Sequence, residues 1–146
     1  MVGMLLVQAM AKLLLLPILV TAVAILVNGY NGPGDGFSAG VIAASGVLLQ
    51  FVAFPYRPIE GLLGIRYTAT MALGGLLAAL VVAFYPLLLG QSILQHQPPP
   101  SAPAVRLGAL ELIGAFAFDV AVFFIVVGFV VGTIMAIART SQRRAR

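Results

Sequence analysis

Apolar residues are arranged along the chain in four long runs that are interrupted by very few polar positions. A helix needs roughly 20 apolar residues to cross a bilayer, because each residue adds about 1.5 Å and the hydrocarbon core is about 30 Å thick. The pattern therefore predicts an all-α integral membrane fold with four transmembrane helices, at residues 4–27, 37–54, 67–89 and 109–138. The last run is long enough to tilt or to project from the membrane.

The segments between these runs have the composition of turns and loops. Residues 29–36 are rich in glycine, Pro55 and Pro58 follow the second run, and residues 95–103 contain four prolines. Proline and glycine interrupt regular structure, so these segments are predicted to end the helices. We see no internal repeat, and we expect residues 1–146 to form a single membrane domain that ends in a polar basic tail at 139–146.

Composition supports a membrane location and excludes several kinds of chemistry. Hydrophobic residues make up 62% of the chain and charged residues 8%, whereas about a quarter of a soluble domain is charged. The absence of cysteine excludes disulfides, thiolate metal sites and thiol nucleophiles. No metal-ligand cluster, nucleophile–base pair or cofactor motif is evident, so we predict no cofactor, no resident metal and no independent enzyme. The chain is too small to enclose a wide pore alone, so we expect it to pack beside other membrane subunits.

The net charge of +4 comes from basic residues that flank the apolar runs. This placement indicates membrane orientation rather than nucleic-acid binding. One side of the membrane would carry the following arginines: Arg57, Arg66, Arg139, Arg143, Arg144 and Arg146. The other side would carry only Arg106. The positive-inside rule therefore predicts that both termini lie in the cytoplasm and that residues 29–36 and 95–103 face outward.

Small residues recur at four-residue spacing in three of the predicted helices. They form the sets Gly36–Gly40–Ala44, Gly74–Ala78 with Gly75–Ala79, and Gly128–Gly132–Ala136. Such faces allow helix backbones to approach closely, and packing is the main attraction between helices in lipid. We predict tight packing at these faces, against this chain or another subunit. The alternative is that glycine and alanine are simply common in membrane helices.

Lys12 lies about eight residues, or roughly 12 Å, into the first predicted helix. A charge at this depth is costly unless it is paired, hydrated or neutral, which suggests a place on an ion path. The alternative is that its flexible stem carries the amine to the cytoplasmic headgroups. Pro17 removes a backbone donor nearby and leaves the Leu13 carbonyl without its helical partner, so water, a cation or an ordinary bend could follow.

Asp119 is the clearest polar exception, because we expect it about ten residues into the fourth helix among apolar neighbours. An ionised carboxylate there needs a cation, a lysine or water beside it. We consider a proton or sodium site, with an inter-helix hydrogen bond or salt bridge that fixes assembly as the alternative. Lys12 is one possible partner. Glu111 is expected near the outer end of the same helix, where the helix dipole suits a carboxylate, and His96 is expected in a solvated loop.

The glycine-rich segment is predicted to be a structural corner before the second helix. It consists of Asn31, Gly32, Pro33, Gly34, Asp35 and Gly36. Glycine permits positive φ, proline fixes a bend, and Asp35 can help to cap the following helix. The segment lacks the Gly-Lys-Ser/Thr ending of a phosphate-binding P-loop.

Three segments together resemble one known family. Residues 29–44 (GYNGPGDGFSAGVIAA) are similar to the signature of the MnhB/MrpB subunit of multisubunit Mrp-type sodium/proton antiporters, which is close to Gly-His-Asn-x-Pro-Gly-Gly-Gly-Phe. Residues 11–17 resemble the family's first helix, and residues 118–128 its last. Tyr30 and Asp35 stand where the family usually has histidine and glycine.

The resemblance implies an accessory subunit of a complex that exchanges sodium for protons across a bacterial or archaeal cell membrane. Such a subunit would pack beside the large subunits that carry the proton channels and would line part of the sodium path, where Lys12 and Asp119 are candidates. A subunit with a purely structural role and the sodium-translocating part of a membrane-bound hydrogenase remain alternatives. A small multidrug exporter also has four helices, but such exporters resemble one another in a first-helix glutamate, and this chain has Lys12 there.

Overall fold

The computed structural model describes residues 2–28, 35–54, 67–94, 106–107, 110–111 and 114–144. These residues form helices α1 (Val2–Asn28), α2 (Gly36–Ala53), α4 (Thr68–Leu88) and α5 (Gly114–Arg144), with two short strands, β1 (Arg106–Leu107) and β2 (Leu110–Glu111). All four helices contain a stretch that is long and apolar enough to cross a membrane. The predicted four-span helical fold is therefore confirmed.

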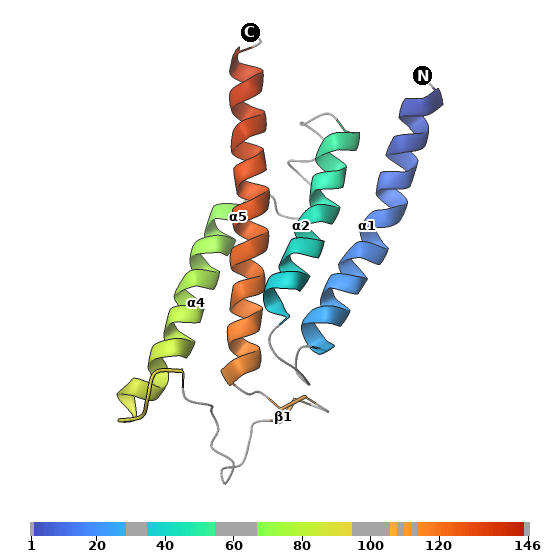
Figure 1. Ribbon diagram of the computed structural model, residues 1–146. Coiled ribbons are helices and arrows are strands. Elements are labelled where there is room, and N and C mark those ends of the chain that lie inside the picture. The colour runs from blue at the N-terminus through green and yellow to red at the C-terminus, as the bar shows by residue number, and fades with distance from the viewer. Residues whose placement is uncertain are drawn as a thin grey trace.

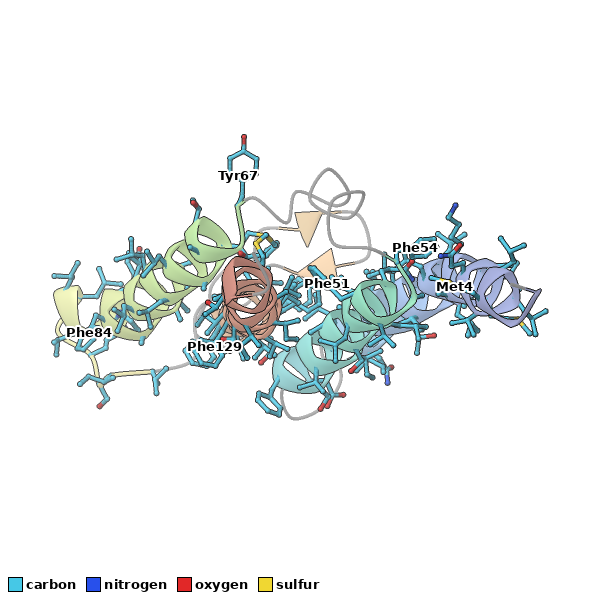
Figure 2. The ribbon with its side chains drawn as sticks, turned by 90° about the horizontal axis from the view of Figure 1, so that it is seen from above. Met4, Phe51, Phe54, Tyr67, Phe84 and Phe129 are labelled. Carbon is cyan, nitrogen blue, oxygen red and sulfur yellow. The ribbon has the colours of Figure 1, made fainter. Side chains whose placement is uncertain are left out.

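The helices stand side by side in a row rather than in a closed bundle (Figure 1). Their order in space is α1, α2, α5, α4, so α5 lies between two helices that precede it in sequence. Figure 2, which looks along the helices, shows the same row end-on. α2 and α5 are parallel, whereas each outer helix is antiparallel to its neighbour. The start of α1 and the end of α5 therefore lie on the same side of the layer of helices, at the top of Figure 1. We call this side the termini side.

α5 differs from the predicted fourth helix at both ends. It begins at Gly114 rather than at 109, because Leu110 and Glu111 pair with Leu107 and Arg106 in an antiparallel ladder. It continues to Arg144, so most of the predicted polar tail is helical. Arginines suit the end of a helix, where the dipole is negative. The predicted bounds of the other helices agree with the structure to within two residues.

Glycines allow the closest approaches between neighbouring helices. A Cβ at Gly75 would lie 2.8 Å from the Ala121 carbonyl oxygen of α5, and one at Gly128 would lie 2.6 Å from the Thr68 carbonyl oxygen of α4. Contacts this short exclude any side chain, so backbone lies against backbone. Near the termini side, the contact between α2 and α5 widens into a small apolar core of Ala44, Val47, Val131 and Met135.

The outer helices of the row are largely uncovered. Within an 18-residue window of each span, 50% of α2 and 28% of α5 are buried, compared with 11% of α1 and 17% of α4. Large apolar side chains such as Leu13 and Leu77 are more than half exposed. A single row cannot shield these surfaces, so lipid or another membrane protein must cover both of its edges and faces.

Candidate functional site

Two polar sites lie at opposite ends of α2. One joins α2 to α1 on the termini side, and the other joins α2 to α5 at the far end. α2 has 18 residues. At about 1.5 Å per residue the two sites are therefore separated by about 27 Å, close to the thickness of the hydrocarbon core.

The termini-side site, which we call the Lys12 cluster, contains Ala11 and Lys12 of α1 together with Gln50 and Phe54 of the α2 end. The Lys12 Nζ lies 5.2 Å from the centre of the Phe54 ring, a cation–π distance. The Gln50 Nε2 donates a 2.7 Å hydrogen bond to the carbonyl oxygen of Ala11. Both bonded residues are buried, Gln50 to 2% exposure and Ala11 to 1%, so this contact fixes the height of Lys12 relative to α2.

The Lys12 amine lies beside the end of α2. Lys12 is exposed, and its amine reaches Phe54, the residue at which α2 has just ended. The C-terminal end of a helix carries partial negative charge, which favours a cation beside it. Pro17 lies within α1, and one turn later the Thr21 Oγ1 donates a 2.8 Å hydrogen bond to the Pro17 carbonyl oxygen.

The far site contains Asp35 and Gly36 of the α2 start together with Asp119 of α5. A Cβ at Gly36 would collide with the Asp119 carbonyl oxygen and would lie 2.9 Å from the Asp119 Cα. Asp119 is partly buried, and Asp35 directly precedes the glycine that packs against its backbone, so both residues lie at the same end of α2. We call these two residues the carboxylate pair.

Two predictions about the carboxylate pair are wrong. Asp119 is the sixth residue of α5, about 8 Å from its start, because α5 begins at Gly114. It therefore lies closer to the start of the helix than the predicted depth of about ten residues. Asp35 occupies the N-cap position of α2, but within the described chain its side chain makes no capping hydrogen bond. Its backbone carbonyl instead accepts a 2.9 Å hydrogen bond from the Ala39 amide.

Lys12 and Asp119 are not partners. Lys12 contacts the residue that follows the end of α2, whereas Asp119 contacts the first residue of α2. The length of α2 separates them, so Lys12 is not the partner of Asp119 that the sequence analysis considered possible. Each of the two residues instead lies near a different end of α2.

The remaining predicted residues lie elsewhere. Asn31, Gly32, Pro33, Gly34 and His96 lie outside the described residues, and Glu111 belongs to strand β2 rather than to α5. Gly40 and Ala44 are buried on α2, where a Cβ at Gly40 would lie 2.8 Å from the Val126 Cβ of α5. Gly128 and Gly132 face the start of α4.

Gln50 is the polar residue that the sequence analysis missed. The apolar run 37–54 contains three polar side chains, and Gln50 carries an amide whereas Ser38 and Ser45 carry only small hydroxyls. An amide in lipid needs a hydrogen-bond partner on a neighbouring helix, which was the available signal. Of the described residues, no three His, Cys, Asp or Glu side chains are grouped to hold a metal ion.

A shallow groove of about 330 Å³ also runs between α4 and α5. Its lining is almost entirely apolar and includes Gly74, Ala78, Ala117, Val120 and Phe124. A Cβ at Gly74 would meet nothing within 4 Å, so this surface has room for a covering side chain or acyl chain.

The family of the chain follows from comparison with known proteins. Residues 6–132 match the model of a domain related to the MnhB subunit of a Na+/H+ antiporter. The chain belongs to this family. The matched region of this MnhB-related chain includes Lys12, Gln50, the carboxylate pair and every glycine contact described above.

Individual relatives agree with the MnhB family model. The B subunit of the Na(+)/H(+) antiporter of Alkalihalophilus pseudofirmus is 34% identical over 83% of each chain. The protein of the same name from Bacillus subtilis is 30% identical over 91% of this chain and 92% of its own. A probable A/B subunit of a K(+)/H(+) antiporter from Rhizobium meliloti is 32% identical over 86% of this chain but only 12% of its own length.

Proposed function

We propose that the protein is an accessory membrane subunit of a multisubunit monovalent cation/proton antiporter. Membership of the MnhB-related family and the names of its relatives support this assignment. The structural observation that carries it is the open row, because four spans in one layer leave both edges uncovered. The other subunits of the antiporter are the partners that would cover part of this apolar surface, and lipid would cover the rest.

The row would cross a bacterial or archaeal cell membrane with both termini in the cytoplasm. α1 begins and α5 ends on the termini side, where Arg139, Arg143 and Arg144 are also found. Basic residues are enriched on the cytoplasmic side of membrane proteins. The carboxylate pair would then face outward, near the opposite boundary.

This orientation can be tested with single cysteines, because the chain has none of its own. Ile93→Cys lies on the far side in an exposed turn, and Thr140→Cys lies on the termini side. A membrane-impermeant maleimide added to intact cells should label the first variant, and should label the second only after permeabilisation. The reverse pattern would overturn the orientation.

The transported ions would be protons and sodium, or potassium as in the name of the Rhizobium meliloti relative. A pair of nearby carboxylates lowers the local potential and concentrates cations around it. Asp119 would act in this way at the outer end of the row and would line the entry to the ion path. Lys12, with its amine at the opposite boundary, would orient the protein rather than conduct ions.

A purely structural role is the second candidate, and a specific contact favours it. The Asp119 backbone packs directly against Gly36, so this residue belongs to a helix interface as well as to the carboxylate pair. Substitution of Asp119 could therefore disturb assembly without affecting any ion.

Exchange and assembly must be measured on the same variants of the whole complex. Asp119→Asn keeps the size of the side chain but removes its charge. We expect normal recovery of the complex and a several-fold lower rate of cation-dependent proton exchange in everted membrane vesicles. Ser45→Ala is the control, because the Ser45 hydroxyl donates its hydrogen bond within its own helix, to the Val41 carbonyl oxygen. An Asp119→Asn complex that assembles and exchanges at the wild-type rate would leave only the structural role.

A further inference from the structure

α1 presents an uncovered apolar face at the edge of the row, as Figure 2 shows. The side of α1 that meets α2 is marked by Ala11 and Ala22, which are buried to 1% and 0% exposure. At 3.6 residues per turn, five large residues lie within a sector of about 80° on the opposite side. Their side chains are between 40% and 71% exposed. We call them the outer face of α1: Leu6, Leu13, Leu16, Val20 and Val27.

Pro17 borders the outer face and removes one hydrogen-bond donor from the middle of the helix. Proline has no backbone N–H, so the Leu13 carbonyl oxygen lacks the partner that it would have in a regular helix. Leu13 and Pro17 both lie more than about 100° around the helix from Ala11. The gap between this carbonyl and Pro17 therefore opens away from α2.

The open carbonyl of Leu13 lies deep in the apolar span of α1. This span runs from Gly3 to Asn28. At about 1.5 Å per residue, Leu13 is about 15 Å from one end of the span and about 22 Å from the other. A backbone polar group without a partner is costly in the hydrocarbon core, and acyl chains have no donor to offer it. This depth is the same for either orientation of the chain in the membrane.

The side-chain donors that contact this part of α1 are bonded to other carbonyls. Within the described residues, the Gln50 Nε2 donates to the Ala11 carbonyl oxygen on the α2 side of the helix. The Thr21 Oγ1 donates to the Pro17 carbonyl oxygen. A donor for the Leu13 carbonyl has to approach α1 from outside the row that the described helices form.

The proline at the other edge of the row is placed differently. Pro86 is fully buried and lies two residues before the last residue of α4. The chain folds back there, and the amides of Gln91 and Leu94 donate hydrogen bonds of 3.0 Å and 3.2 Å to the carbonyl oxygens of Pro86 and Ala83. The end of α4 thus receives donors from its own chain, whereas the gap at Pro17 lies in mid-helix beside an exposed face.

We propose that the outer face of α1 docks on a transmembrane helix of another subunit, and that a hydroxyl or amide side chain of that helix donates a hydrogen bond to the Leu13 carbonyl oxygen. This inference rests on the proposed function, which supplies the other subunits. The apolar side chains alone select lipid and protein equally, because acyl chains are as apolar as leucine. The open carbonyl selects protein, since acyl chains cannot donate a hydrogen bond.

The first test supplies the missing donor within α1. Pro17→Ala restores the N–H that pairs with the Leu13 carbonyl, so the isolated chain in bicelles should unfold at the same or a higher midpoint. In the purified complex the donor of the partner loses its acceptor. The variant should therefore dissociate roughly 3- to 20-fold faster than the wild type, the range expected for one hydrogen bond between membrane helices.

Gly3→Ala is the matched control, because it introduces the same residue into α1 at a position where a Cβ meets nothing within 4 Å. It should change neither the midpoint nor the dissociation rate. A lower midpoint of the isolated Pro17→Ala chain would place the donor within the same chain, for example in residues 55–66, and would overturn the proposal. Dissociation of the Pro17→Ala complex at the wild-type rate would also overturn it, since water or a local bend then satisfies the carbonyl.

The second test identifies the donor. A photoreactive phenylalanine analogue in place of Leu16, on the outer face, should cross-link to one helix of another subunit in the purified complex. Each hydroxyl or amide residue of that helix near the cross-link is then replaced by an apolar residue of similar size. One replacement should speed dissociation of the wild-type chain but have no further effect on Pro17→Ala, because both changes remove the same bond. Additive effects, or a cross-link to lipid alone, would contradict the proposal.

These experiments separate the inference from the proposed function. If the wild-type chain does not purify with other antiporter subunits, the proposed function is wrong. If it does, and the two substitutions act additively, only the docking role of the outer face is wrong.

Discussion

The two sides of α2 are joined to their neighbours in different ways. Towards α5, the nearest atoms at Gly36 all belong to the Asp119 backbone, and Gly40 lies against the Val126 side chain and the Phe123 carbonyl oxygen. Towards α1, the contact depends on side chains: the Gln50 amide bonds to Ala11, and the Phe54 ring lies beside Lys12. At Gly46, a glycine of this second interface, the nearest atoms belong to the Ile18 and Leu15 side chains of α1.

The difference indicates which part of the row is rigid. A backbone cannot move aside without bending or shifting a whole helix, whereas a side chain can change rotamer. The parallel pair of α2 and α5 should therefore behave as the fixed centre of the protein. α1 should be the more adaptable edge, attached to that centre by one buried hydrogen bond and by contacts that can adjust.

The largest loss of stability is expected for Gly36→Ala. Its added methyl would overlap the Asp119 carbonyl, so α2 and α5 must separate. Overpacking of this kind costs about 1–3 kcal/mol, and the upper end is expected here because both walls are backbone. The free energy of unfolding of the chain in bicelles measures the effect.

Gly74→Ala is the control for that substitution. A Cβ at Gly74 meets nothing within 4 Å, so alanine should leave stability unchanged or raise it slightly through its better helix propensity. If both alanine variants are equally stable, the backbone contact at Gly36 does not limit the approach of α2 to α5.

The sequence predicted the spans well because their signal is simple. Length and hydropathy suffice to identify the four helices, since every backbone polar group in lipid must be paired within the segment. The pattern could not predict the start of α5, because residues 110–111 are as compatible with a strand as with a helix until their pairing with 106–107 is known. An error of five residues there placed Asp119 too deep.

The arrangement of the helices was not predictable from the pattern. Spacing showed that Gly36 and Gly40 share a face with Ala44, but nothing in the sequence says that this face meets α5 rather than another subunit. The sequence alone allows Lys12 to pair with Asp119, because it does not give the order of the helices. A row with α2 between α1 and α5 places these charges at opposite ends.

A smaller loss is expected for Gln50→Leu, which removes the buried hydrogen bond between α2 and α1. Hydrogen bonds between membrane helices contribute about 0.6 kcal/mol on average and up to about 1.7 kcal/mol. The burial of both groups suggests about 1 kcal/mol for Gln50. Unfolding in bicelles should show this loss, and Ser45→Ala, which affects a bond within α2 only, should not. A Gln50→Leu protein as stable as the wild type would mean that α1 is attached by apolar packing alone.

Gly46→Ala sharpens the comparison within a single helix. A Cβ there would lie 2.8 Å from the Ile18 Cγ2, nominally as close as the contacts in the other interface. Because the neighbour is a side chain on the edge helix, Ile18 and α1 can yield. We expect a cost of about 1 kcal/mol or less, well below that of Gly36→Ala. Equal costs for the two variants would show that α1 is as rigidly placed as α5.

The smallest effect is expected for Lys12→Met, which keeps the length of the side chain and removes its charge. A cation–π contact at an exposed site contributes only about 0.5–1 kcal/mol, and the apolar stem of methionine still packs beside Phe54. Stability should therefore hardly change, whereas the level of α1 in the membrane should shift inward, since no charge then remains along α1 to reach the boundary. The accessibility of a cysteine at Met4 to an impermeant maleimide reports this shift: it should fall in Lys12→Met and be restored in Lys12→Arg. Unchanged labelling would mean that the Gln50 hydrogen bond, and not the charge of Lys12, fixes the level of α1 against α2.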